Sequence, residues 1–301
     1  MRKVIGIGET IMDFVIKNEK PQAAVPGGSV FNSLISLGRM GVQSTFISET
    51  GNDRAGSIIL RFLKENGVNT DFVCVYDDGR TPISLAWLND DNDAEYEFFK
   101  NYPKCRLDIL RWPRIERDDI VMMSSYFVLN PALRTKVKEF LDYASQQGAI
   151  IYYDFNFRSS HRDEVVHLYA DIKENMEYAD IVRGSTEDLM NMFGCEDAET
   201  VFGREVEFYC RNMICTDGGK DVTLLTPDVK KNFPVKEIET VSTIGAGDNF
   251  NAGVVYGLLM EGVMKDEVNN IRADQWERIM KYAIDFSAEV CGSMENYIAR
   301  R

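Results

Sequence analysis

The residues best suited to chemistry lie late in the chain, where the small residues Gly245, Ala246 and Gly247 are followed at once by Asp248. The apolar run 250–260 has helical spacing, so the small residues are expected to form a tight turn that opens a helix. The first N–H groups of a helix have no partner within it and attract anions, above all phosphates. An acid beside such a site can take a proton from an attacking hydroxyl. The pattern therefore indicates phosphoryl transfer, with an ordinary helix N-terminus as the alternative.

The composition of the 301-residue chain argues against several other classes of protein. A net charge of −14 disfavours nucleic acid and anionic membranes as partners. No stretch approaches the roughly 20 apolar residues of a membrane span, and the start of the chain has no signal-peptide pattern. Six cysteines without a Cys-x-x-Cys pair predict reduced thiols in a cytoplasmic protein. The two histidines, His161 and His167, are expected on a surface helix, which leaves little from which to build a Ser-His-Asp hydrolase.

The first hundred residues predict the start of an α/β sheet and a polar site at its edge. Residues 3–10 form an apolar, strand-like segment, and Asp13 follows near its end, where α/β proteins place ligand contacts. Asp13 could hold sugar hydroxyls, or it could be a solvated turn residue. Ile11 stands where a dinucleotide-binding motif would have its third glycine, which argues against a Rossmann site.

A second polar site is predicted where Gly27 and Gly28 lead into an apolar helix over 30–41. Glycines allow a ligand to approach the backbone, and Asn32 in the first turn can donate to and accept from a polyol. The alternative is a plain loop followed by a polar core residue.

From 72 to 102 the pattern changes to strands without helices. The segments 82–88 and 95–100 predict a hairpin around an acidic turn, and 12–17 could join them in a small sheet. We expect this sheet to cover the site as a lid and to offer a surface for dimerisation.

Three further clusters follow predicted strands in the second half of the chain. The buried strand 149–154 ends at Asp154, Asn156 and Arg158, where the arginine could meet an anion or pair with Asp154. The cluster Ser185-Thr186-Glu187-Asp188 fits a helix cap, and a carboxylate pair holding magnesium is the alternative. The third cluster could be a hairpin turn or a nucleotide-binding turn, and it consists of Thr216, Gly218, Gly219 and Lys220.

The order of these motifs resembles the PfkB family of carbohydrate kinases, which have the ribokinase-like fold. The resemblance covers nearly the whole chain and looks closest to the fructokinase and 2-keto-3-deoxygluconate kinase branch. It rests on five motifs, which are Gly27-Gly28 with Asn32, Gly51-x-Asp53 with Gly56, Asp154-x-Asn156-x-Arg158, Thr216-x-Gly218 and Gly245-Ala246-Gly247-Asp248.

The resemblance implies a role for each motif. Asp248 would be the base, the turn of Gly245, Ala246 and Gly247 would hold the transferring phosphoryl group, and Arg158 would lie near sugar and phosphate. The implied sugar-binding residues are Asp13, Gly27, Gly28, Asn32 and Lys100. The implied nucleotide-binding residues are Ser185, Asp188, Thr216, Gly218, Gly219 and Lys220, with Asp188 and Glu187 near Mg²⁺, through water.

Five positions depart from the family pattern. Ser242 replaces an acid associated with a monovalent cation, which leaves activation by K⁺ open. Ser185 and Asp188 stand where the family has asparagine and glutamate, the aspartate being one methylene shorter, and Asp221 replaces a glycine. Lys100 replaces an arginine in the lid, and because lysine makes only a point contact with a carboxylate, neutral hexoses are favoured.

The resemblance therefore implies a single domain over 1–301, a three-layer α/β/α unit with a mostly parallel sheet and a β lid built from about 11–19 and 72–102. The implied activity is transfer of the γ-phosphoryl group of ATP, with Mg²⁺, to a primary hydroxyl of a sugar, with fructose as the first candidate. The alternatives are 2-keto-3-deoxygluconate, ribose or a nucleoside as substrate, or a sugar-binding relative without catalysis.

Overall fold

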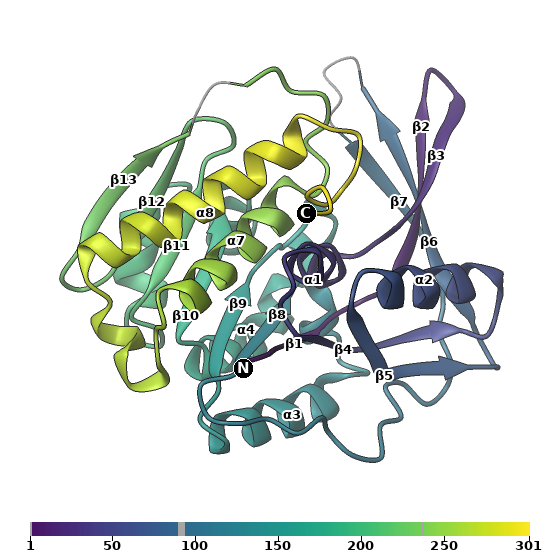
Figure 1. Ribbon diagram of the computed structural model, residues 1–301, viewed down its shortest axis with the longest axis horizontal. Helices are drawn as coiled ribbons and strands as arrows, with labels where there is room; N and C mark the ends of the chain where they lie inside the picture. Colours follow the sequence, from purple (N-terminus) through teal and green to yellow (C-terminus); the bar gives the residue numbers. More distant parts are fainter. Residues whose placement is uncertain (1, 90–93, 236–237) are drawn as a thin grey trace.

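A nine-stranded sheet organises the structure, a computed structural model that describes residues 2–89, 94–235 and 238–301 (Figure 1). The strand order is β13-β12-β11-β10-β9-β8-β1-β4-β5, and all neighbours are parallel except those involving β12 and β13. The strands are β1 (Val4–Ile7), β4 (Ser44–Gly51), β5 (Val68–Tyr76), β8 (Ile120–Ser124), β9 (Ile150–Asp154), β10 (Ile181–Ser185), β11 (Met213–Thr216), β12 (Asp221–Leu225) and β13 (Lys230–Pro234).

Helices cover both faces of this sheet because its central strands are apolar on both sides. In β8, Ile120 and Met122 belong to one hydrophobic core, whereas Val121 and Met123 belong to the other. The first core contains side chains from α1 (Ser29–Arg39), α2 (Arg54–Glu65), α7 (Ala246–Met260) and α8 (Ala273–Cys291). The second contains side chains from α3 (Arg134–Gln146), α4 (Val165–Tyr178), α5 (Thr186–Phe193) and α6 (Ala198–Val201). The predicted three-layer α/β/α architecture is confirmed.

A separate four-stranded sheet stands beside the large one (Figure 1). Its order is β3-β2-β6-β7, with β2 (Ile11–Lys17), β3 (Lys20–Gly27), β6 (Arg80–Leu88) and β7 (Ala94–Asn101). Asp13 lies opposite Ser84, which lies opposite Phe98, so these three side chains share one face of the sheet. This face carries the residues that reach the site described below.

The predicted lid boundaries need two corrections. Residues 72–76 belong to β5, which pairs with β4 at the edge of the large sheet, so the predicted range 72–102 began too early. The segment Lys20–Gly27 was missed as a strand because two prolines interrupt it, which edge strands tolerate. Most of the predicted acidic turn, residues 90–93, lies outside the described residues.

Helix α7 is held against α8 by small residues. A Cβ atom at Gly253 would come within 2.5 Å of the Ala283 Cα, and one at Gly257 within 2.8 Å of the Ile279 Cα. This close packing fixes the axis of α7 and, with it, the turn at its start. Among the described residues, no helix combines the length and the apolar character that a membrane crossing requires.

Candidate active site

A first cavity lies where the small sheet covers the carboxyl ends of three neighbouring strands. Glu9, Ser125 and Asn156 follow the ends of β1, β8 and β9 and line its floor. Its other lining residues are Ile11, Asp13, Gly28, Ser29, Asn32, Tyr96, Phe98, Lys100, Tyr126, Arg158, His161, Ile244, Gly245 and Asp248. The cavity thus brings together most of the residues expected around the sugar and the base.

Asp248 lies in the first turn of α7 and faces this cavity. Its Oδ2 atom accepts a hydrogen bond of 2.7 Å from the Asn32 amide, and its backbone carbonyl accepts one of 2.7 Å from Ser33. Burial raises the pKa of Asp248 to about 6, although hydrogen bonds from Asn32 and Ser29 lower it. The carboxylate is therefore ionised at neutral pH and is a better proton acceptor than an ordinary aspartate.

Asp13 places a second carboxylate in the same cavity, and this one is buried. It accepts a hydrogen bond from the Ser84 hydroxyl on the neighbouring strand. Burial raises its pKa to about 6, and the nearby Asp248 and Glu9 act in the same direction. Gly27 makes room for it, since a Cβ atom there would lie 2.2 Å from the Asp13 carboxylate.

The turn before Asp248 has the shape of an anion site. Gly245 caps α7 with φ of +79°, which glycine adopts without strain. The first bond of the helix runs from Asn249 N–H to the Gly245 carbonyl, at 2.9 Å. The N–H groups of Gly247 and Asp248 precede that bond and point away from the helix, whereas Ala246 N–H is 3.2 Å from the Thr243 carbonyl.

Sequence reasoning missed a buried arginine behind this turn. Arg183 on β10 pairs with Asp154 at 3.0 Å and donates to the Thr216 hydroxyl at 2.6 Å. A Cβ atom at Gly247 would lie 3.3 Å from its guanidinium. The suggested ion pair between Arg158 and Asp154 is therefore wrong, and Arg158 lines the first cavity instead. The available signal was an arginine inside an otherwise apolar strand.

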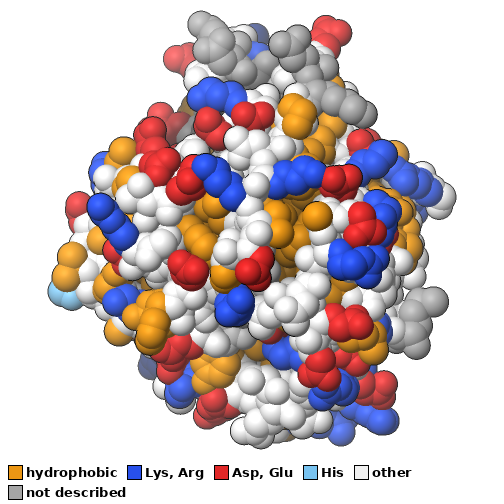
Figure 2. Space-filling model, turned by 90° about the vertical axis from the view of Figure 1, so that its left-hand side faces the viewer, with side chains coloured by type: hydrophobic (Ala, Val, Ile, Leu, Met, Phe, Trp, Pro, Cys, Tyr) orange, Lys and Arg blue, Asp and Glu red, His pale blue; other side chains and the backbone are white. Residues whose placement is uncertain are grey.

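A second cavity opens on the other side of the glycine turn. Its lining residues are Arg183, Ser185, Thr216, Gly218, Gly219, Val222, Val235, Ile238, Thr240, Thr243, Ala246, Gly247, Phe250, Ile284, Ser287, Ala288 and Cys291. A third hollow joins the two cavities, and Arg183, Ser185 and Gly247 line both it and the second cavity. Figure 2 shows one face of the molecule, where acidic and basic side chains are interspersed and hydrophobic ones show in the hollowed middle.

The second cavity fits a nucleotide. Because the Thr216 hydroxyl accepts from Arg183, its own proton remains to be donated to a phosphate oxygen. The positions that Cβ atoms would occupy at Gly218 and Gly219 are open, so a ligand can contact the backbone there. Apolar walls from Val222 and Val235 suit a base.

The Ser185–Asp188 cluster is a capping box, as its first interpretation predicted. Asp188 accepts from the backbone N–H groups of Ser185 at 2.7 Å and Phe157 at 2.6 Å, and also from the Ser185 hydroxyl at 2.8 Å. Little lone-pair capacity is left on Asp188 for a direct metal bond, so this carboxylate fits Mg²⁺ only through water. Glu187 is exposed and lines the joining hollow. Within the described ranges, no cluster of three or more metal-ligating side chains occurs.

Two predicted ligand lysines are already paired. The Lys100 ammonium lies 3.0 Å from Glu9, which also accepts from Tyr102. Lys100 therefore lines the first cavity as half of an ion pair rather than as an unbalanced cation. Lys220 pairs with Asp217 at 3.1 Å and is absent from the residues that line the second cavity.

Ser242 and Asp221, which also depart from the family pattern, have different surroundings. Ser242 is buried, and its hydroxyl accepts from Ile244 N–H at 3.2 Å. Asp221 is exposed at the start of β12 and does not line the second cavity, which agrees with the requirement that this acid be turned away from phosphates.

His161 was wrongly expected on a surface helix. It lies half-buried in a short 3₁₀ turn, lines the first cavity and stacks on Tyr126 with ring centroids 3.8 Å apart. Glu164 holds both rings, at 2.8 Å from the His161 Nδ1 and 2.8 Å from the Tyr126 hydroxyl. Only its closeness in sequence to Arg158 could have suggested this position.

Relatives of the chain carry names consistent with this geometry. A "Probable fructokinase-5" from Arabidopsis thaliana is 26% identical over 304 residues, covering 97% of this chain and 90% of its own. A "Fructokinase" from Rhizobium leguminosarum bv. trifolii is 27% identical over 268 residues, covering 87% and 81%.

Solved structures share the fold. A Vibrio cholerae fructokinase in a fructose-, ADP- and calcium-bound form superposes with a TM-score of 0.83 at 20% identity, covering 98% of this chain and 94% of its own. An aminoimidazole riboside kinase from Salmonella enterica gives 0.81 at 21% identity, covering 100% and 97%. The family model described as "pfkB family carbohydrate kinase" matches residues 1–294. The chain therefore belongs to the pfkB family of carbohydrate kinases.

Proposed function

We propose that this protein transfers the γ-phosphoryl group of ATP to a primary hydroxyl of fructose. The observation that carries the proposal is the position of Asp248. Its carboxylate faces the first cavity, while the N–H groups of its turn lie at the passage to the second cavity. A hydroxyl in the first cavity and a phosphate in the second would meet at this turn.

The residues divide the work of such a transfer. Asp13 and Asn32 would hold sugar hydroxyls, and Asp248 would accept the proton of the attacking hydroxyl late in the reaction, for which a carboxylate suffices. The N–H groups at Gly247 and Asp248 would stabilise the transferring phosphoryl group, with Arg183 behind them and Thr216 donating to the nucleotide phosphates. Mg²⁺, when bound to the triphosphate, would neutralise part of its charge.

Two observations support fructose as the substrate. The two relatives named above are described as a probable fructokinase and a fructokinase, at 26% and 27% identity. The pairing of Lys100 with Glu9 also leaves a substrate carboxylate without an unbalanced cation from the lid, which disfavours 2-keto-3-deoxygluconate. A nucleoside is the second candidate, because the stacked rings of His161 and Tyr126 offer a flat wall that a planar base could contact.

We also propose a homodimer formed through the outer face of the small sheet. Ile83, Leu85, Trp87 and Phe99 lie on the face that points away from Asp13, and Trp87 and Phe99 are exposed. Sedimentation should show a dimer at micromolar concentration, and a monomer would refute this assembly. We expect the enzyme to act in the cytoplasm, where its cysteines stay reduced.

A coupled ADP-release assay with MgATP tests the function. Its panel contains fructose, ribose, 2-keto-3-deoxygluconate and nucleosides, each with and without K⁺. Fructose should give the highest kcat/KM, and Asp248→Ala should lower kcat by at least about 100-fold while sugar binding remains. Sugar binding by the wild-type protein without any turnover would support the non-catalytic alternative instead. A rate independent of K⁺ is the expected consequence of Ser242.

A further inference from the structure

Asn249, the residue after Asp248, is completely buried and uses its whole side chain in hydrogen bonds. Its amide donates to the Gly245 carbonyl at 2.7 Å and to the Asn296 carbonyl at 2.8 Å, and its oxygen accepts from the Ser36 hydroxyl. Both Asn249 and Ser36 have no exposed surface. A carboxamide supplies two donors and one acceptor at once, which neither aspartate nor serine does.

The segment 293–301 lies directly behind the glycine turn. A Cβ atom at Gly245 would come within 2.9 Å of the Asn296 carbonyl oxygen, so the two backbones are in contact. Residues 296–298 are buried although both flanking residues are exposed. The backbone of this segment is therefore part of the support for the turn.

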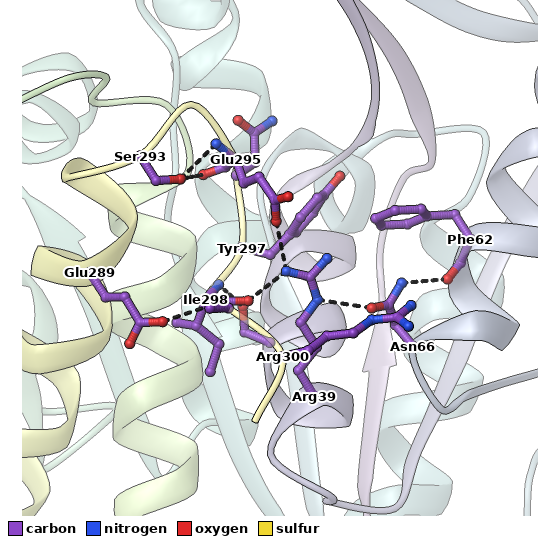
Figure 3. A network of polar contacts seen from close by, with 12 residues as sticks. Arg39, Phe62, Asn66, Glu289, Ser293, Glu295, Tyr297, Ile298 and Arg300 are labelled. Atoms are coloured by element: carbon purple, nitrogen blue, oxygen red, sulfur yellow. Dashed lines mark hydrogen bonds and ion pairs between the residues drawn. The ribbon is translucent and has the colours of Figure 1, made fainter.

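The same segment is fixed to α1 (Figure 3). The Arg39 guanidinium donates to the Ile298 carbonyl at 2.6 Å and to Glu295 at 2.8 Å, and it lies over the Tyr297 ring. Ile298 N–H donates to the Ser36 hydroxyl at 3.2 Å. The Tyr297 hydroxyl donates to the Pro26 carbonyl, next to the glycine pair that precedes α1.

These contacts connect α1 with α7, the two helices that carry Asn32 and Asp248. Asn32 and Ser33 of α1 bond to Asp248, and Ser36, one turn further along α1, bonds to Asn249. The segment 293–301 bonds to both sides, to α1 through Arg39 and Ser36 and to α7 through Asn249. The spacing between α1 and α7, and the direction of the turn, are thus set by one connected hydrogen-bond network.

We propose that Asn249 is a positioning residue. Through its hydrogen bonds, the fixed backbone of the segment 293–301 holds the phosphoryl-binding turn and Asp248 in place. The inference rests on the proposed kinase function. Without the Asn249 side-chain amide, the Asn296 carbonyl loses its donor and the Gly245 carbonyl keeps only the backbone bond from Asn249 N–H, so the turn is held less firmly. Misplacement of reacting groups by about 1 Å can lower a rate by about 100-fold.

The test compares Asn249→Ala with the wild-type enzyme in steady-state kinetics. We expect kcat to fall by about 10- to 100-fold, while KM for the sugar changes by less than about threefold because no group that holds the sugar is removed. The affinity for ADP with aluminium fluoride and sugar should fall in parallel with kcat, while the affinity for ADP alone stays unchanged. Asn175→Ala is the control, since Asn175 is equally buried but lies on α4, and its kcat should be normal.

A second variant, Arg39→Met, releases the segment without touching the turn. Its kcat should fall as well, and the double variant should be no slower than Asn249→Ala, because both changes break one network. A normal kcat in Asn249→Ala, or strictly additive losses, would overturn the proposal. Failure of the kinase function would instead appear as a wild-type protein without turnover.

Discussion

Asp248→Asn should inactivate the protein and stabilise it. In the folded chain the pKa of Asp248 is raised to about 6, chiefly by burial, against an ordinary value of 3.8. At 1.36 kcal/mol per pKa unit, keeping this carboxylate ionised at about pH 8 opposes folding by up to roughly 3 kcal/mol. Asparagine keeps an oxygen that can accept from Asn32 but carries no charge, so the variant should gain most of that amount.

The pH dependence follows from the direction of the shift. Because the pKa is higher in the folded than in the unfolded state, ionised Asp248 opposes folding fully above pH 6. The opposition fades as the pH falls from about 6 towards 3.8. The stability difference between variant and wild type should thus be about three times as large at about pH 8 as at about pH 4.5.

Chemical denaturation at the two pH values measures this difference. Asp197→Asn is the control, because hydrogen bonds from Thr200 lower the pKa of Asp197 and its replacement should bring no gain at about pH 8. An Asp248→Asn variant that is no more stable than wild type at about pH 8, or equally stabilised at both pH values, would refute the destabilisation assigned to this partly buried charge.

Three further outcomes are expected. On the acid side, kcat/KM should begin to fall near pH 6. It should reach about one tenth of its plateau at pH 5 if Asp248 alone must be ionised, and it should fall more steeply if Asp13 must be ionised as well. A flat profile down to pH 5 would contradict this. Gly247→Ala should lower kcat by at least about tenfold, because the new methyl group would lie 3.3 Å from the Arg183 guanidinium. Circular dichroism would check that the variant is folded, and a normal kcat would show that the guanidinium can move aside. Lys100→Met removes the ion pair between the small sheet and the end of β1, so KM for the sugar should rise several-fold with little change in kcat, and initial rates that show an unchanged KM would exclude this role.

The sequence predicted elements whose pattern is local. The strand predicted over 149–154 is found at 150–154, and the helix predicted over 30–41 is found at 29–39. The glycine turn before Asp248 was likewise recognisable because its signal is contained in a few consecutive residues. Such patterns depend on backbone preferences and on the period of apolar residues, both of which a sequence displays directly.

Partners across strands could not be predicted. Asp154 was followed by an arginine four residues later, yet it pairs with Arg183, which only the parallel register of β9 and β10 brings beside it. In the same way, Lys100 of β7 pairs with Glu9, which lies between β1 and β2 and far from it in the sequence. The edge strand β3 was missed because its exposed, proline-containing sequence is stabilised by pairing with β2 and not by its own propensity.

Asp13 belongs to the small sheet, whereas Asn32 and Asp248 belong to helices of the large domain. A sugar that binds all three would join the two parts, so departure of the product and separation of the sheet from the domain would be one event. A sugar lacking the hydroxyl that reaches Asp13 would leave this junction unmade. Water could then compete for the phosphoryl group. The rate of ATP hydrolysis in the presence of each sugar would therefore measure how well that sugar holds the small sheet against the large domain.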